Sequence, residues 1–179
     1  AMPAVAAADG ADQVLLFIVD ILREEATLLI PNDFVRGLAE RSFGVAVTGD
    51  STCIDAAAAT ATVERLIASE GIKGLIGGMC SGETIASLER VGVPNGMVMI
   101  SPSATSPALS TIEDNGLFFR TSPSDARQGE VMAEIMMERG IQNAAVTYTN
   151  NDYGKGLADA FAAAFQEKGG TVTVNTAHD

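Results

Sequence analysis

The stretch IKGLIGGMCSGETIASLERVGVPNGMVMISPSATSPAL, residues 72–109, decides the fold of this chain. It contains two short apolar runs, at residues 74–78 and 97–100, and small and hydroxylated residues follow each run at once. Short apolar runs that alternate with helical patterns predict neighbouring parallel strands. In an open α/β sheet, ligands bind at the carboxyl ends of the strands, which is where we expect both hydroxyl-rich turns to lie.

The two turns present hydroxyl groups and main-chain N–H groups. No charged residue occurs in either turn before Glu83. Ser81, Ser103 and Thr105 are the candidate side chains, and each has two interpretations: a cap of the helix or turn that follows, or a contact to a ligand. The two are compatible, because a helix N-terminus leaves N–H groups unsatisfied until something accepts from them. This chemistry suits a small anion such as a carboxylate, and it predicts binding rather than catalysis.

The composition is that of a globular protein. Its 179 residues are 47% hydrophobic, enough for one good core or for one domain and part of another. The mean hydropathy is +0.22. No apolar run approaches the roughly 18 residues of a membrane-spanning helix. The net charge is −12 and no basic stripe is present, which argues against a nucleic-acid partner.

Helical patterns, glycines and apolar runs alternate along the chain. Strands are predicted at residues 14–19, 44–48, 74–78, 97–100, 117–121, 144–148 and 171–175. Helices are predicted to begin near residues 55, 82, 125 and 152, and glycines predicted to form left-handed C-caps follow them at positions 71, 92, 140 and 169. Units of roughly 25–30 residues with this punctuation predict an α/β fold, a parallel doubly wound sheet with helices on both faces.

Three helical segments have an apolar face. Residues 59, 63, 66 and 67 form the first face, residues 131, 132, 135 and 136 the second, and residues 157, 161 and 165 the third. The methionines at 132, 136 and 137 are interpreted as core residues. Asp55 is predicted to cap a helix. Several of the aspartates near predicted strand or helix ends are interpreted as caps rather than as acid–base pairs; the six at such positions are Asp12, Asp20, Asp50, Asp55, Asp125 and Asp152.

Cys53 and Cys80 are the two cysteines, and both follow a predicted strand end at the same edge of the sheet. A disulfide is compatible with that placement, whereas two free thiols are the default in the cytosol, so the residues leave both open. Residues 78–82 also match the G-x-[SC]-x-G elbow, with Cys80 as a nucleophile of an α/β cysteine hydrolase or amidotransferase. That hypothesis needs a base, and the single histidine, His178, lies near the end of the chain.

Phosphate-binding loops, dinucleotide fingerprints and zinc-type Cys/His spacings do not occur in the sequence, so no cofactor and no metal site are predicted. The first eleven residues are predicted to be a disordered terminus or a signal remnant. Their small-residue run AMPAVAAA, residues 1–8, is similar to the A-x-A tail of a secretory signal, although no basic or apolar segment precedes it.

Four segments carry a family resemblance. They are Cys80-Ser81-Gly82, the run MISPSATSPAL at residues 99–109, FFRT at residues 118–121 and NNDYGKGLA at residues 150–158. Together they resemble the branched-chain amino-acid-binding proteins of ABC importers, the type I periplasmic binding proteins. The resemblance extends from about residue 43 to the end of the chain, and its most specific parts are the ISPSATSP and NDYGKGLA stretches.

The resemblance implies two Rossmann-like lobes that close on an amino acid. Residues 12–121 are then the first lobe and residues 122–179 the start of an incomplete second lobe. In the family, the positions of Ser81 and Thr105, with backbone N–H groups, hold the ligand α-carboxylate. The positions of Ser103 and Thr105 accept from the α-ammonium, and that of Tyr153 lines the site from the second lobe. The predicted ligand-binding residues are therefore Ser81, Ser103, Ala104, Thr105 and Tyr153.

The resemblance also implies compartment and partners. Cys53 and Cys80 match a disulfide pair in relatives, which favours an oxidising compartment, here the periplasm. The implied function is that of an extracytoplasmic solute-binding component, not an enzyme. It captures a branched-chain-like amino acid or another small carboxylate and delivers it to the membrane permease of an ABC importer.

Two departures from the family limit this expectation. Residues 20–42 lack the glycine-rich ligand loop that family members have after the first strand, and the chain stops partway through the second lobe. A lobe and part of another are expected to bind weakly, since closure supplies much of the ligand burial. An unpaired sheet edge also favours a homodimer through that edge, so a non-binding truncated copy that dimerises stays an alternative.

Overall fold

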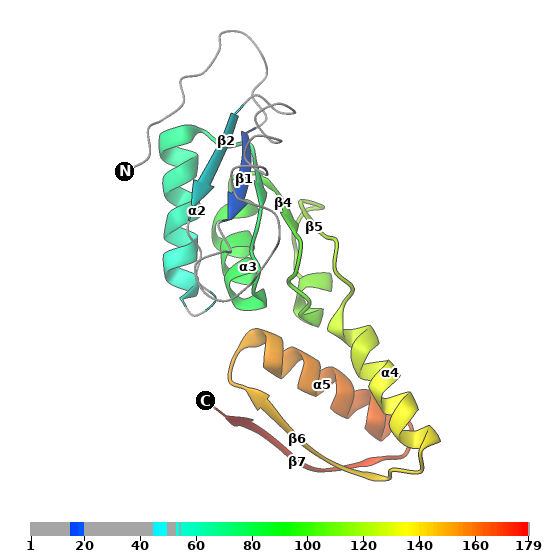
Figure 1. The fold of residues 1–179 in the computed structure, drawn as a ribbon. Coiled ribbons are helices and arrows are strands. Elements are labelled where there is room, and N and C mark those ends of the chain that lie inside the picture. Colours follow the sequence, from blue (N-terminus) through cyan, green and yellow to red (C-terminus); the bar gives the residue numbers. More distant parts are fainter. Residues whose placement is uncertain (1–14, 20–44, 50–52, 54, 179) are drawn as a thin grey trace, which may run out of the picture. The chain divides into compact units, whose positions relative to one another are not determined.

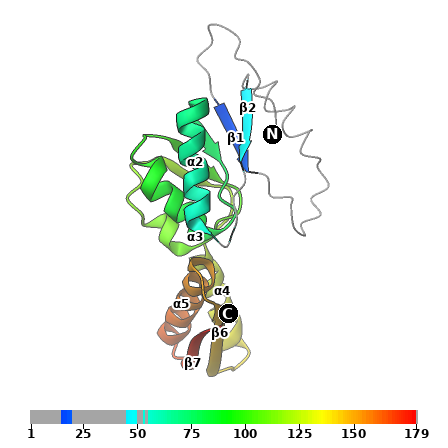
Figure 2. The same ribbon diagram turned by 90° about the vertical axis from the view of Figure 1, so that its left-hand side faces the viewer.

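The computed structural model describes residues 15–19, 45–49, 53 and 55–178, and Figures 1 and 2 show their helices and strands in two views. The first eleven residues, the segment 20–42 and their predicted properties lie outside the described residues. The chain divides into two compact units, which are described one at a time. Unit 1 is Ala1–Met79, Glu83–Pro102 and Asp114–Phe119, and unit 2 is Cys80–Gly82, Ser103–Glu113 and Arg120–Asp179.

A five-stranded sheet in the order β2-β1-β3-β4-β5 is the centre of unit 1. Its strands are β1 (Leu15–Val19), β2 (Val45–Gly49), β3 (Gly74–Ile76), β4 (Val98–Ser101) and β5 (Phe118–Arg120). The pairs β1–β2, β1–β3 and β3–β4 are parallel. The predicted parallel α/β fold is therefore confirmed. The ends of β3 and β4 meet as expected, because Gly77 N donates to Ile100 O at 3.0 Å and Ser101 Oγ donates to Gly78 O.

Helices join the strands of this sheet. They are α2 (Ala56–Glu70), α3 (Ser81–Ser87), the π-helix η1 (Leu88–Gly92) and the 3-10 helix η2 (Pro107–Ser110). Asp55 caps α2 as predicted, since its carboxylate accepts from Ala57 N and Ala58 N at 2.9 and 3.0 Å. The predicted apolar face of α2 is also confirmed: Ala59, Val63 and Leu66 are buried and Ile67 is half-buried.

Three of the four glycines predicted at left-handed helix ends have a positive φ: Gly71, Gly140 and Gly169. The prediction for Gly92 is wrong, because Gly92 ends η1 and the left-handed residue is Gly96, with φ 61°. Gly92 instead allows a close approach. A Cβ at that position would meet Met99 Sδ at 2.6 Å, so the buried Met99 of β4 takes the space of a side chain.

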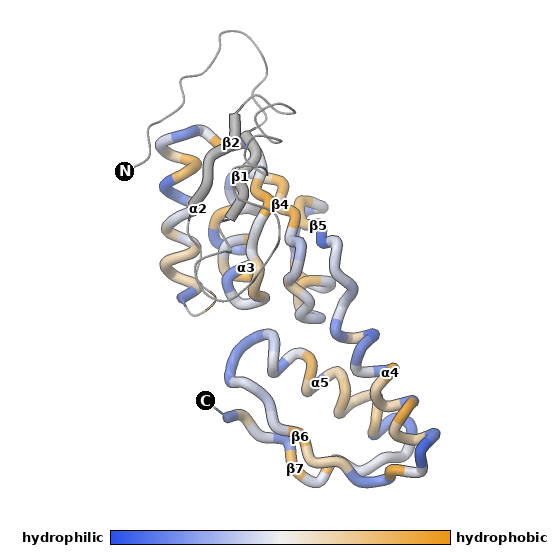
Figure 3. The backbone as a smooth tube through the Cα atoms, viewed as in Figure 1, coloured by the Kyte–Doolittle hydropathy of each residue, from blue (hydrophilic) through white to orange (hydrophobic). Residues whose placement is uncertain are grey.

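Unit 2 has its own core, built from two helices and a parallel pair of strands. The helices are α4 (Asp125–Glu138) and α5 (Asp152–Glu167), and the strands are β6 (Asn143–Thr149) and β7 (Thr171–His178). Phe161 and Phe165 stack with ring centroids 5.3 Å apart, and Ala133, Ala144 and Ala164 complete the buried cluster. In Figure 3, α4 and α5 accordingly contain hydrophobic residues, which are coloured orange. None of the helices in the described part of the chain is long and apolar enough to cross a membrane.

The predicted apolar face of α4 is wrong. Its buried positions include Gly129 and Ala133, whereas Met132 and Ile135 are 41% and 43% exposed. Small residues face α5 because the helices approach closely: a Cβ on Gly129 would meet Phe161 N at 2.6 Å. Of the three methionines interpreted as core, those at 136 and 137 pack partly against the cluster and the one at 132 does not.

Gly129→Ala should destabilise unit 2 by about 1–3 kcal/mol, because the added methyl meets the α5 backbone, which can only shift by moving the helix. Urea unfolding monitored at amide protons of α5 measures the change. Gln128→Ala is the matched control, since Gln128 is exposed on the same turn. Equal urea midpoints for the two variants would contradict the close approach.

Candidate functional site

The loop of residues 103–106, here called the hydroxyl loop, is held through three successive carbonyl groups. Ala104 O accepts from Arg120 Nη1 and from Ser122 Oγ, both at 3.3 Å. Thr105 O accepts from Asp125 N at 2.9 Å. Ser106 O accepts from Arg120 Nη1 at 2.9 Å. A planar trans peptide directs its N–H opposite to its carbonyl, so the N–H of Thr105 points away from Arg120.

Arg120 is the cationic anchor of the hydroxyl loop. Its guanidinium also donates to Ser110 Oγ, so it joins both ends of the segment from Ala104 to Ser110. Burial lowers the pKa of Arg120, and the negative charge of Asp125 opposes that lowering. Arginine suits this position because its planar fork offers several donors and stays charged when partly buried.

Ser81 connects the first turn to the hydroxyl loop. It begins α3, is 1% exposed, and its Oγ accepts from Ser106 N at 3.1 Å. The structure therefore brings Ser81 to the residue that follows Thr105. The interpretation of Ser81 as a helix cap is therefore corrected in one respect. The backbone N–H from which its Oγ accepts is that of Ser106 in the hydroxyl loop.

Thr105 is half-buried and its Oγ1 donates to Asp125 Oδ2 at 2.8 Å. Ala104 is 1% exposed and Ser103 is half-buried. Among the described residues, every buried side-chain nitrogen or oxygen has a hydrogen-bond partner. The hydroxyl groups of Thr105 and Ser106 are thus both hydrogen-bonded within the protein, the second by accepting from Ala108 N at 3.4 Å.

Tyr153 lies in the first turn of α5 and is 45% exposed. It lines a pocket of about 260 Å³ whose other residues include Met132, Tyr148, Leu157 and Phe161, and none of the hydroxyl loop. The start of α5 nevertheless lies against that loop. A Cβ on Gly156 would meet Ser106 Oγ at 3.0 Å.

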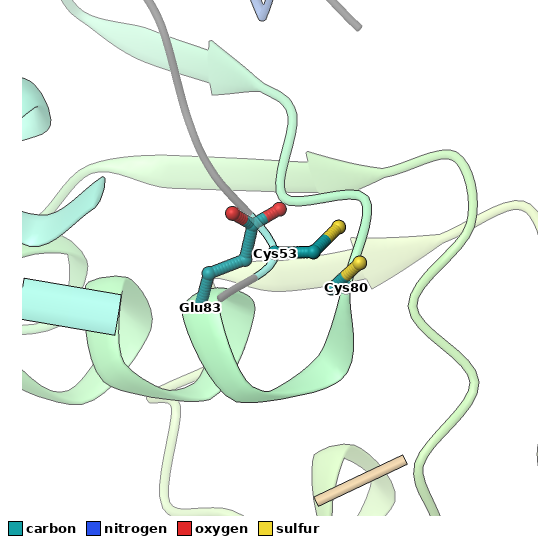
Figure 4. Close-up of side chains that lie close together, drawn as sticks. All are labelled: Cys53, Cys80 and Glu83. Carbon is teal, nitrogen blue, oxygen red and sulfur yellow. The ribbon is translucent and has the colours of Figure 1, made fainter. Parts of the chain in front are cut away.

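Cys53 and Cys80 are both disulfide-bonded, and as the two cysteines of the chain they bond to each other. Figure 4 shows their sulfur atoms facing one another beside Glu83. The ligand atoms of these three residues lie within 4.8 Å of one another, a grouping that could hold a metal ion. The disulfide removes both thiolates, which are the metal-binding form of cysteine, so we assign no metal to this grouping.

The disulfide also overturns the hypothesis of a nucleophilic Cys80. A cysteine nucleophile acts as a thiolate with a base beside it, and a sulfur in a disulfide has no such form. The base that the hypothesis required is engaged elsewhere: His178 Nδ1 lies 2.8 Å from Thr147 Oγ1.

Ser106, which lies in the hydroxyl loop, and Arg120 and Asp125, which hydrogen-bond to the loop, were not predicted as site residues from the sequence. Asp125 does not cap α4, because Ser124 is the N-cap of that helix and accepts from Ala126 N at 3.3 Å. Either residue of the dipeptide Ser124-Asp125 could cap α4. The position of the hydroxyl loop decides the outcome, because Asp125 accepts from Thr105 and Ser124 is left as the cap. A charged arginine within the short apolar run of residues 117–121 was the available sequence signal for Arg120.

The parallel strands and connecting helices of each unit define the α/β class of fold. Two solved structures of ABC transporter substrate-binding proteins from Desulfitobacterium hafniense share the fold. Their TM-scores are 0.70 and 0.65 at 21% and 22% identity, over 94% of this chain and 51% of each of theirs, and the second is a complex with Leu. The chain belongs to the receptor family ligand binding region, whose sequence profile matches residues 36–179.

Curated relatives include several Leu/Ile/Val-binding proteins. The Brucella melitensis Leu/Ile/Val-binding protein homolog 3 is 38% identical over 112 residues, 61% of this chain and 29% of that protein. The Salmonella typhimurium Leu/Ile/Val/Thr-binding protein is 35% identical over 117 residues, 65% of this chain and 31% of that protein. The chain therefore spans less than a third of the length of these relatives.

Ser81→Ala should speed hydrogen exchange at the Ser106 amide about tenfold, because a lost acceptor to a buried N–H costs about 1–3 kcal/mol. Exchange measured by NMR at neutral pH tests this. Ser69→Ala, an exposed serine of α2, is the control and should leave the Ser106 amide unchanged. An unaltered exchange rate in Ser81→Ala would show that Ser81 does not hold the loop.

Unfolded, unreduced protein should contain no free thiol by colorimetric titration, since both sulfurs are in the disulfide. Reducing it should lower the free energy of unfolding by about 3–4 kcal/mol on the chain-entropy estimate for a loop spanning residues 53–80. The double variant Cys53→Ser, Cys80→Ser should match the reduced protein and should not respond to reductant. Two titratable thiols in fresh protein would contradict the bond.

Proposed function

We propose that this chain is part of an extracytoplasmic solute-binding protein of an ABC importer, and that its hydroxyl loop binds the head group of a branched-chain-like amino acid. In this proposal, residues 12–121 belong to the first lobe and residues 122–179 begin the second. The ligand-binding residues are those of the sequence prediction: Ser81, Ser103, Ala104, Thr105 and Tyr153.

The observation that carries the proposal is the anchoring of the hydroxyl loop. Its three consecutive carbonyl groups, at residues 104–106, accept hydrogen bonds from within the protein. The donors are Arg120, Ser122 and the Asp125 N–H. This orientation directs the Thr105 N–H away from Arg120. An N–H group that is not turned toward the loop's own anchor can donate to a ligand carboxylate. The Thr105 hydroxyl lies beside it, so one residue presents both a donor and an oxygen to an amino acid head group.

The names of the relatives support the choice of ligand. They are described as binding Leu, Ile and Val, and in one case Thr as well. A protein of the same fold is described as a complex with Leu. In this proposal the chain acts without a catalytic step and works with a membrane permease. The disulfide supports an extracytoplasmic, oxidising location such as the periplasm.

Self-association is the second candidate function. In the described residues the sheet of unit 2 has two strands, and several large apolar side chains around it are exposed: Met132, Ile135, Tyr153 and Val174. Exposed apolar side chains and an unpaired sheet edge favour pairing with a second copy of the chain. Light scattering across a tenfold range of protein concentration distinguishes a monomer from a dimer. A dimer silent to every amino acid would favour this candidate over ligand binding.

Calorimetric titration with Leu, Ile, Val, Asp and Lys tests the first candidate. We expect heat with the three branched-chain ligands and a loss of at least tenfold in affinity in Thr105→Val, which keeps the shape and removes the hydroxyl. Thr62→Val is the matched control in α2, far along the chain from the loop. Silence across the panel, or an equal loss in both variants, would count against the proposed function.

A further inference from the structure

Cys53, Cys80 and Glu83 form a cluster of metal-ligating side chains at the start of α3. Their ligand atoms, two sulfurs and a carboxylate oxygen, lie within 4.8 Å of one another. Figure 4 shows the three side chains gathered on one side of the turn that leads into α3. In the disulfide form the two sulfurs are bonded to each other and are not thiolates, so the cluster gains its metal-binding chemistry only when the disulfide is opened.

One helical turn supplies two of the three ligands. Cys80 directly precedes α3 and Glu83 lies three residues further along, a spacing that places both side chains on the same side of a helix. Glu83 is 2% exposed, and its Oε1 accepts from Met79 N at 2.6 Å. This bond folds the carboxylate back over the turn that contains Cys80. A carboxylate oxygen has more than one lone pair, so it can accept from an N–H group and bind a cation together.

Cys53 supplies the third ligand from the chain segment before α2. It is exposed, whereas Cys80 is half-buried and Glu83 is buried, so the cluster is open to solvent on the Cys53 side. A reductant and a hydrated cation can therefore reach the sulfur atoms. The buried carboxylate favours a cation at this place, because a buried carboxylate is stable where it is paired or coordinates a metal.

The donor set determines the kind of metal. Thiolates are soft ligands that suit zinc, whereas magnesium and calcium prefer oxygen ligands alone. Neighbouring ligand atoms around a tetrahedral zinc lie about 3.6–3.8 Å apart, for Zn–S and Zn–O bonds of about 2.3 and 2.1 Å. The three atoms of the cluster already lie within 4.8 Å of one another, and opening the disulfide lets the two sulfurs separate. A water molecule then completes the four ligands, as in zinc sites with three protein ligands.

We propose that Cys53, Cys80 and Glu83 bind one zinc ion once a dithiol has reduced the disulfide. In the first step the dithiol is oxidised to its own disulfide, and its two hydrogens pass to the cysteine sulfurs. In the second step zinc binds both sulfurs, and the two thiol protons go to the buffer. The zinc then links the same two cysteines that the disulfide linked. Because Ser81 follows Cys80 and accepts from Ser106 N, the zinc also restores the restraint on the turn that holds the hydroxyl loop. The site is independent of the ligand that this loop binds.

Zinc titration of the chain in two redox states tests the site. The protein is reduced with dithiothreitol, which is then removed by gel filtration under nitrogen because a dithiol itself binds zinc. In competition with a chromophoric zinc chelator, the reduced chain should bind one zinc ion about a hundredfold more tightly than the oxidised chain, or better. Cobalt(II) in place of zinc should give a thiolate-to-cobalt charge-transfer absorption, and excess magnesium or calcium should not remove it.

Variants of the three ligands separate the built site from a pair of thiols. Glu83→Gln should weaken zinc binding by the reduced chain about tenfold, because an amide oxygen lacks the charge of a carboxylate. Glu89→Gln is the matched control, since Glu89 is exposed on η1 and its change should leave the affinity unaltered. Cys53→Ser should roughly halve the cobalt charge-transfer absorption, because one thiolate remains. It replaces an exposed residue, so it also tests the site where reduced Glu83→Gln does not fold.

Zinc should also stabilise the reduced chain. It should raise the midpoint of urea unfolding and slow hydrogen exchange at the Ser106 amide, because it binds the folded state more tightly than the unfolded state. The oxidised chain should show neither effect. Equal zinc affinities of the wild type and Glu83→Gln would overturn the inference, since the two thiols alone would then account for binding. An unchanged urea midpoint of the reduced chain would overturn it as well, since zinc would then bind folded and unfolded chains alike.

Discussion

The hydroxyl loop depends on one constraint: three consecutive carbonyl groups must find donors inside the protein. Arg120 meets two of them and the Asp125 N–H meets the third. A buried carbonyl without a donor costs free energy comparable to a lost hydrogen bond, so the loop is stable only in the conformation that satisfies all three. The direction of the Thr105 N–H and the environment of its hydroxyl both follow from that conformation.

The disulfide and the hydroxyl loop act on the same short segment. Cys80 is covalently bonded to Cys53, and the next residue, Ser81, accepts from the Ser106 N–H. The turn after β3 is therefore restrained at two adjacent positions by bonds of very different strength. A residue that must hold a loop through one hydrogen bond benefits from such a restraint, because less conformational freedom remains to be lost when the bond forms.

Unit 2 shows how small residues determine helix packing. Gly129 lets α4 approach the α5 backbone, and Gly156 does the same between α5 and Ser106. Two large apolar side chains of α4, Met132 and Ile135, are consequently more than a third exposed. Hydrophobic periodicity predicts the presence of a helix well, but it misassigns the buried face when glycine and alanine make the contact.

The sequence by itself determined the features that depend on neighbours along the chain. The parallel strands, the Asp55 cap and the left-handed glycines at 71, 140 and 169 were all predicted, because capping and turn formation involve residues within a few positions of one another. The family resemblance supplied the predicted ligand-binding residues and the disulfide pairing, and the structure contains that disulfide.

Only the tertiary structure decided the rest. Gly92 accommodates Met99, which comes from the next strand rather than from the same helix end. Asp125 and Ser124 stand side by side in the sequence with equal capping ability, and Asp125 turns to Thr105 because α4 begins beside the hydroxyl loop. Arg120 becomes an anchor for the same reason. Contacts between residues that are distant in sequence depend on where the chain returns, and no local pattern contains that information.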